Sequence, residues 1–147
     1  MADTLDDFVH EIKEQIHEET KEAYGERAYQ RWLNPLFMGS MDNPDGYARS
    51  VGVCGDTMEI FLRFEGGRVQ EALFQTDGCG SSSVCASFAV ELSLGKVPDE
   101  LSEINAELIM EKLEGLPKED EHLAFLAAGT LHQAVDNYMI KRAKGRV

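Results

Sequence analysis

The chain has 147 residues, 43% of them hydrophobic, which is enough for one domain with a sizeable core. Its 27 acidic and 14 basic residues give a formal net charge of −13. Because this charge repels phosphate groups and anionic lipid, we expect neither nucleic acid nor a membrane surface as a partner. No run of about 18 apolar residues occurs, so no transmembrane helix is predicted. The acidic first residues lack an apolar stretch, and they predict a cytoplasmic protein without a secretion signal.

Charge is unevenly distributed along the chain. Residues 1–26 hold nine acids against two lysines, and residues 98–123 hold the same numbers. We interpret both stretches mainly as solvated helix faces, with docking on a basic partner as the alternative. The last seven residues reverse the sign and carry four cations, which suit the negative end of a helix.

The first part of the chain is predicted to be helical. Residues 5–23 place apolar residues on one helical stripe with acids opposite, as in an amphipathic helix. Gly25 interrupts the pattern, a second helical stretch follows, and the Asn-Pro pair at 34–35 ends it. We therefore divide the chain into an acidic helical extension over residues 1–27 and one domain over residues 28–147.

A hairpin is predicted in the middle of the chain. Over residues 57–64 the period of the apolar residues changes to two, which indicates a half-buried strand. A turn with two glycines follows at 65–68, and a return strand is expected over 69–76. With a shorter strand around residues 49–53, the sequence predicts a three-stranded antiparallel sheet.

Helices are predicted after the sheet. The serines at 81–83 are placed to cap a helix that Gly95 closes. Asn105 is expected to cap a short helix, and a long final helix is predicted from Lys118 to Lys144. Helices packed on one face of an antiparallel sheet make the expected fold class α+β.

The chain has three cysteines, an odd number, and the expected compartment is reducing, so a disulfide framework is not predicted. We therefore interpret the cysteines as candidates for metal ligation or thiol chemistry. Cys54 precedes the second strand and Cys79 follows the third, each beside glycine. Because adjacent antiparallel strands bring the start of one beside the end of the other, we expect Cys54, Asp56 and Cys79 to meet at one edge of the sheet. Cys85 shares a helical stripe with apolar residues and is interpreted as a core residue.

Two further features bear on this site. Cys79 stands just before a predicted helix N-terminus, where the helix dipole favours the thiolate that binds metals. His122 lies in the first turn of the long final helix and is the histidine we retain as a candidate. The other three histidines are interpreted as surface or packing residues.

The order of these motifs resembles that of the NifU/IscU family of iron–sulfur cluster scaffolds. From about residue 28 to about residue 144, the chain carries Asn34-Pro35, Cys54-Gly55-Asp56, Gly78-Cys79-Gly80-Ser81, Leu116-Pro117 and His122. The resemblance implies a sheet and helices like those of NifU, IscU and SufE. It implies that iron, a transient iron–sulfur cluster of the [2Fe–2S] type, or zinc binds at Cys54, Asp56, Cys79 and His122. It also implies a role without turnover, and a cysteine desulfurase as the partner that delivers sulfur.

The chain departs from the family at two motifs. The family has a third cysteine directly after its histidine, whereas this chain has Leu123, which cannot bind a metal. The remaining two sulfurs, one oxygen and one nitrogen can still satisfy tetrahedral zinc. The family's chaperone-docking motif, Leu-Pro-Pro-Val-Lys, is replaced by the charged run at 116–120, which argues against handoff to the specialised chaperone.

Other interpretations remain open at this stage. Two protomers that each give Cys54 and Cys79 could share one cluster in a homodimer. The chain could instead be a SufE-like sulfur acceptor that carries a persulfide on Cys54 or Cys79. It could also be a degenerate relative, zinc-bound or metal-free, that regulates cluster assembly.

Overall fold

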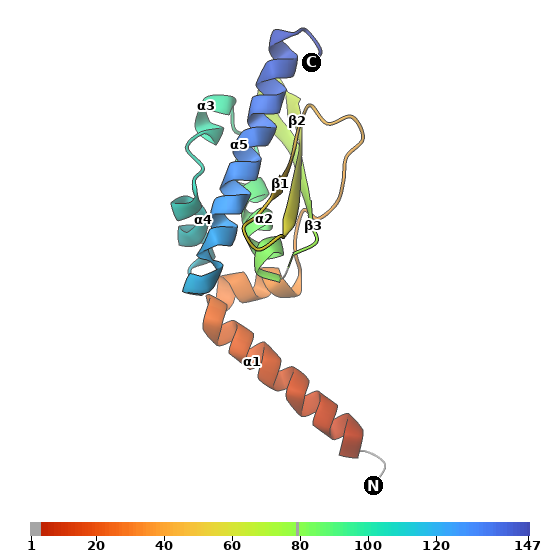
Figure 1. The fold of residues 1–147 in the computed structure, drawn as a ribbon, viewed down its shortest axis with the longest axis vertical. Helices are drawn as coiled ribbons and strands as arrows, with labels where there is room; N and C mark the ends of the chain where they lie inside the picture. Colours follow the sequence, from red (N-terminus) through yellow and green to blue (C-terminus); the bar gives the residue numbers. More distant parts are fainter. Residues whose placement is uncertain (1–3, 79) are drawn as a thin grey trace.

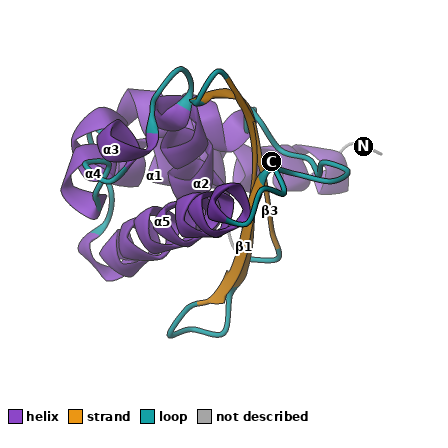
Figure 2. Ribbon diagram, turned by 90° about the horizontal axis from the view of Figure 1, so that it is seen from above, coloured by secondary structure: helices purple, strands orange, loops and turns teal. Residues whose placement is uncertain are grey.

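The computed structural model describes residues 4–78 and 80–147. Its strands pair in the order β1-β2-β3, antiparallel throughout, and the helices cover one face of the sheet (Figure 2). This confirms the predicted α+β class. Along the chain the elements are α1 (Thr4–Leu33), β1 (Gly46–Val51), β2 (Thr57–Glu65), β3 (Arg68–Thr76), α2 (Gly80–Ser93), α3 (Pro98–Leu101), α4 (Ala106–Leu113), the 3₁₀ turn η1 (Lys118–Asp120) and α5 (Glu121–Ala143).

The predicted hairpin is confirmed, with Gly66 and Gly67 both at positive φ in its turn. The first strand was predicted at 49–53 and lies at Gly46–Val51, so that prediction was wrong in position. Pairing begins earlier because the Asp45 backbone amide donates to the Leu62 carbonyl, next to the first strand residue. It ends at Val51 because a tight turn follows, in which the Gly52 amide donates to the Asp56 carbonyl at 2.7 Å.

The core lies between the sheet and the helices α2, α4 and α5. Period-two alternation turns Met58, Ile60 and Leu62 of β2 toward these helices, and all three side chains are fully buried. Cys85 of α2 is also fully buried, which confirms its interpretation as a core residue. The long final helix is two elements, because residues 118–120 form a 3₁₀ turn before α5 begins at Glu121.

Helix α1 has two parts with different surroundings, separated at Gly25, where the backbone is non-helical with φ 79° and ψ 171°. The second part packs on the body. Its Ala28 is fully buried, and Arg31 binds Glu91 of α2 through a 2.9 Å ion pair. Residues 4–24 project away from the body, with the N-terminus at the opposite end of the molecule from the C-terminus (Figure 1). Among the described residues, no helix is both long and apolar enough to cross a membrane.

Candidate metal centre

Cys54 and His122 lie in contact, with 3.2 Å between Sγ and Nε2. Cys54 is exposed in the β1–β2 turn, where Gly55 has a positive φ of 86°. This turn rests on α5, since a Cβ added at Gly52 would lie 3.0 Å from the Leu126 side chain. Leu126 is one helical turn beyond His122, so the packing of the turn on α5 brings the thiol to the imidazole.

Asp56 is held on the other side of the same turn, against the start of α2. Its Oδ2 accepts a hydrogen bond from the Ser82 hydroxyl at 3.2 Å. The carboxylate also lies close over Gly78, because a Cβ added to that glycine would be 3.0 Å from the Asp56 Cγ. The β1–β2 turn therefore places Cys54 toward α5 and Asp56 toward α2.

Asp77 closes the end of the β2–β3 pair beside these residues. Its Oδ1 accepts a 2.7 Å hydrogen bond from the backbone amide of Thr57. Hydrogen bonds from Thr57 stabilise the ionised carboxylate and hold the pKa of Asp77 below its usual value of 3.8. The Thr76 hydroxyl donates to the Thr57 carbonyl at 2.6 Å. Together these bonds fix the strand ends that flank the candidate site.

The start of α2 is tied to η1 as well as to Asp56. The Ser81 hydroxyl donates to Oδ2 of Asp120 at 3.0 Å. The serines at 81–83 were predicted to cap α2, but the helix begins at Gly80, so they lie within its first turn. Both serines are buried, and each donates its hydroxyl to a carboxylate, Ser81 to Asp120 of η1 and Ser82 to Asp56 of the β1–β2 turn.

Cys79 lies outside the described residues, so its predicted meeting with Cys54 and Asp56 stays a prediction. Its two sequence neighbours are described, and both must be small. A side chain at Gly78 would meet Ser82, with 2.9 Å between the two Cβ atoms. A side chain at Gly80 would overlap the indole of Trp32 on α1. Close packing therefore requires glycine on both sides of the third candidate ligand.

The distance between the sulfur and the nitrogen is compatible with two ligands of one metal ion. Sulfur and nitrogen ligands on one tetrahedral zinc lie about 3.5 Å apart, and the Cys54–His122 separation of 3.2 Å is close to this. Within residues 4–78 and 80–147, no three His, Cys, Asp or Glu residues come together in a group that could hold a metal ion. Leu123 contributes no ligand, and its side chain is 1% exposed in the core. The described part of the chain thus supplies two donors in contact, with Asp56 nearby on the same turn.

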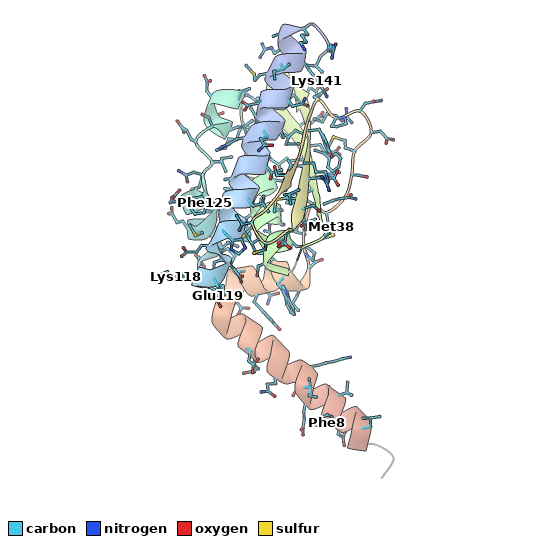
Figure 3. All side chains as sticks on the ribbon, viewed as in Figure 1. Phe8, Met38, Lys118, Glu119, Phe125 and Lys141 are labelled. Atoms are coloured by element: carbon cyan, nitrogen blue, oxygen red, sulfur yellow. The ribbon has the colours of Figure 1, made fainter. Side chains whose placement is uncertain are left out.

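The surface around the pair is apolar on one side and charged on the other. Val53, beside the thiol, is 90% exposed, and Phe125 on α5 is also exposed. Lys118 and Glu119, which replace apolar residues of the family's chaperone motif, are exposed just before α5 (Figure 3). The charged run predicted from the sequence therefore lies at the surface beside the candidate site.

Sequence reasoning missed the residues that support the site. Ser81, Ser82 and Asp120 act through hydrogen bonds between elements that are far apart in the sequence. The one available signal was the run of three serines directly after the Gly-Cys-Gly motif. That run was interpreted as a cap because isolated serines are common at helix N-termini.

Comparison with known proteins gives consistent results. Residues 23–145 match the family described as NifU-like N terminal domain. The chain is 36% identical over 125 residues to the iron–sulfur cluster assembly scaffold protein IscU of Escherichia coli K12, covering 82% of this chain and 97% of that protein. It is 34% identical over 123 residues to the scaffold protein IscU 1 of Archaeoglobus fulgidus, covering 82% and 80%. The crystal structure of the N-terminal part of a NifU-like protein from Brucella abortus superposes with a TM-score of 0.66 at 19% identity, over 83% of this chain and 98% of that one.

Proposed function

Since this chain belongs to the NifU-like N-terminal domain family, we propose that it is an iron–sulfur cluster assembly scaffold. In this proposal Cys54, Asp56, Cys79 and His122 bind iron and the nascent cluster, which is cargo and leaves again. The observation that carries the assignment to these residues is the 3.2 Å contact between the Cys54 thiol and the His122 imidazole. The similarity to IscU proteins over most of the chain supports the same function.

The geometry is suited to holding a cluster weakly. Cys54 is exposed in a turn, so a bound cluster would have one side open to solvent and to a receiving protein. Leucine at the family's third cysteine position removes one thiolate, and the remaining set binds a cluster less tightly because thiolate is the ligand that iron–sulfur clusters select. We infer that the cluster is of the [2Fe–2S] type and transient, and that zinc is the alternative occupant of the same ligands.

The proposed role is binding without turnover. Iron and sulfur must both reach the site, and the sulfur donor that fits this function is a cysteine desulfurase in the cytoplasm. Exposed Lys118 and Glu119 stand where the family's chaperone motif is apolar, which supports delivery of the cluster without the specialised chaperone. A homodimer that shares one cluster through two pairs of cysteines remains a proposal that the oligomeric state of cluster-loaded protein would test.

The test is anaerobic purification with iron, zinc and acid-labile sulfide measured per chain. We expect iron with matching sulfide in the parent protein and loss of both in the Cys54→Ala/Cys79→Ala variant. The matched control is Cys85→Ala, because that cysteine is fully buried in the core and should leave the metal content unchanged. Zinc without sulfide would favour the degenerate, zinc-bound regulator, and equal iron in all three proteins would refute the ligand assignment.

A second candidate function is sulfur acceptance. Cys54 is exposed and its sulfur lies beside an imidazole that can take up the thiol proton, as a nucleophilic cysteine requires. The Cys54 thiolate would attack the terminal sulfur of a persulfide on the desulfurase, and the desulfurase thiolate would leave. Mass spectrometry after incubation with desulfurase and cysteine should then show one added sulfur atom on Cys54 or Cys79. Absence of that adduct under conditions where the desulfurase turns over would exclude this function.

A further inference from the structure

The N-terminal part of α1, residues 4–24, carries an apolar stripe that packs against no other element in the described structure. Leu5 is 71% exposed and Phe8 is 59% exposed, and Val9 and Ile12 continue the stripe on the same face. The sequence of residues 4–24 carries seven acids and two lysines. Most of the stability of a helix in a protein comes from packing of its amphipathic face, so burial of the stripe would stabilise it.

A cleft of complementary character lies at the opposite end of the molecule. It has a volume of about 790 Å³, and Tyr47 and Phe61 form an aromatic wall on the sheet face away from the helices, with ring centroids 5.1 Å apart. Lys141 and Arg146 line it from the end of α5 and the C-terminal residues. Figure 3 shows Lys141 and Phe8 at opposite ends of the molecule.

The C-terminal residues beside the cleft are basic in an otherwise acidic protein. Residues 141–147 carry four cations and no acidic side chain, against a net charge of −13 for the whole chain. The two carboxylates that line the cleft are engaged in hydrogen bonds. Oδ2 of Asp45 accepts from the Phe64 amide at 2.8 Å, and Oε2 of Glu59 accepts from the Tyr47 hydroxyl at 2.6 Å. These bonds orient the two carboxylates and leave them charged, so the two cations and two carboxylates of the lining balance. The complement to the acidic helix is therefore the basic stretch 141–147 beside the cleft, and Tyr47 offers the aromatic contact.

We propose that these two surfaces bind each other between copies of this chain. The acidic helix 4–24 of one copy docks over the cleft of the next, against its basic residues 141–147. Because different surfaces meet, the contact is heterologous and adds copies head to tail, in a closed ring or an open chain. In the copy that provides the cleft, the candidate metal centre stays uncovered, since it lies at the start of α5 and the cleft lies at its end.

Other arrangements of the helix are less favourable. A symmetric pair of helices would bring two net-negative segments together, which costs free energy through like-charge repulsion. A chain cannot dock its own helix, because the helix leaves the body at Gly25 and extends away from the cleft (Figure 1). Residues 141–147 beside the cleft provide the opposite charge.

Sedimentation of the full chain across protein concentration tests the proposal. We expect the average mass to rise with concentration beyond that of a dimer, and to fall when salt is raised, because screening weakens the charge complementarity. Phe8→Glu should weaken association by about tenfold or more, since it places a charge in the apolar contact. Met38→Glu is the matched control, because Met38 is an exposed apolar residue elsewhere on the surface (Figure 3).

Charge reversal in the basic residues 141–147 beside the cleft should have the same effect as the change in the helix. Lys144→Glu/Arg146→Glu is expected to prevent association, whereas Lys96→Glu/Lys112→Glu, with the same change in net charge, should not. Both Lys96 and Lys112 are exposed and lie outside the cleft.

Mixing the two defective proteins distinguishes a heterologous contact from a symmetric one. The Phe8→Glu protein keeps an intact cleft, and the Lys144→Glu/Arg146→Glu protein keeps an intact helix. We expect neither to associate alone and the mixture to form a complex that stops at one copy of each. A parent chain that stays monomeric up to hundreds of micromolar would overturn the proposal. Association of the parent without association of the mixture would also overturn it.

Discussion

His122 and Leu123 are neighbours in the sequence, yet they belong to different regions of the molecule. His122 points to the rim formed by the β1–β2 turn, where it contacts an exposed thiol, whereas Leu123 points into the core. One step along a helix rotates a side chain by about 100°, so adjacent residues at the start of α5 serve chemistry and packing separately. The rim, meaning the β1–β2 turn and His122, holds the candidate ligands and buries little apolar surface. The core beneath it supplies most of the stability.

The largest effect on stability is expected from the core under the rim. Leu131→Ala should lower the free energy of unfolding by about 2–5 kcal/mol, because Leu131 is fully buried in the core formed by α5. Urea denaturation measures the loss. The metal content per folded chain should not change, and a loss of metal in folded protein would show that core and rim are coupled.

Leu123→Cys changes the packing of the core and the set of candidate ligands at the rim at the same time. The smaller side chain leaves space in the core, and we expect a loss of about 1–3 kcal/mol in the free energy of unfolding. At the same time the variant restores the third cysteine of the family, so iron and sulfide per chain should increase after anaerobic reconstitution. Leu123→Ala is the control, since it creates space without a thiol and should not raise the iron content. An equal rise in both variants would mean that loosened packing, not the added sulfur, is responsible.

Asp77→Asn tests the support of the rim and its dependence on pH. The pKa of Asp77 is lowered in the folded chain, so the carboxylate contributes stability above its unfolded pKa, and this is lost as pH falls through the folded value. The parent should therefore lose more stability than the variant between pH 4 and more acidic values. Thermal unfolding at a series of pH values measures this, with Asp42→Asn as a control at an exposed loop position. Identical pH profiles for parent and Asp77→Asn would contradict the assigned role.

The smallest effect on stability is expected at the rim itself. His122→Ala should change the free energy of unfolding by no more than about 0.5 kcal/mol, because His122 is half-buried at the rim and is not one of the core residues. Its affinity for zinc should nevertheless fall by about tenfold or more, since one of two contacting donors is removed. Competition with a chromophoric chelator measures the affinity, and His132→Ala provides a control histidine further along α5. Unchanged zinc affinity in His122→Ala would remove this residue from the ligand set.

The sequence predicted the elements better than the contacts between them. The period-two pattern located β2, and Asn105 was correctly expected to cap α4, where its side chain accepts a bond from the Leu108 amide at 2.9 Å. The start of β1 was misplaced because Asp45 and Gly46 resemble turn residues, whereas strand pairing begins directly after Asp45. The start of this pairing depends on contacts with β2, and the local sequence pattern around residues 45–46 carries no information about them.

The candidate site was predictable in part. Cys54 was expected from the hairpin, but its contact with His122 depends on the packing of the β1–β2 turn on α5, which neither segment encodes alone. The roles of Ser81 and Ser82 depend on carboxylates from η1 and from that turn. These bonds join elements separated by at least 26 residues, so spacing along the chain could not have indicated them.

The packing of Trp32 against Gly80 has a spectroscopic consequence. The chain contains one tryptophan, and its indole lies directly on the residue that follows Cys79. Iron–sulfur clusters absorb light where tryptophan emits, so a cluster bound at Cys79 would quench this fluorescence by energy transfer over a short distance. Zinc, which has no such absorption, would leave the emission bright. The protein thus carries its own optical reporter, which can follow the arrival and departure of a cluster without any added label.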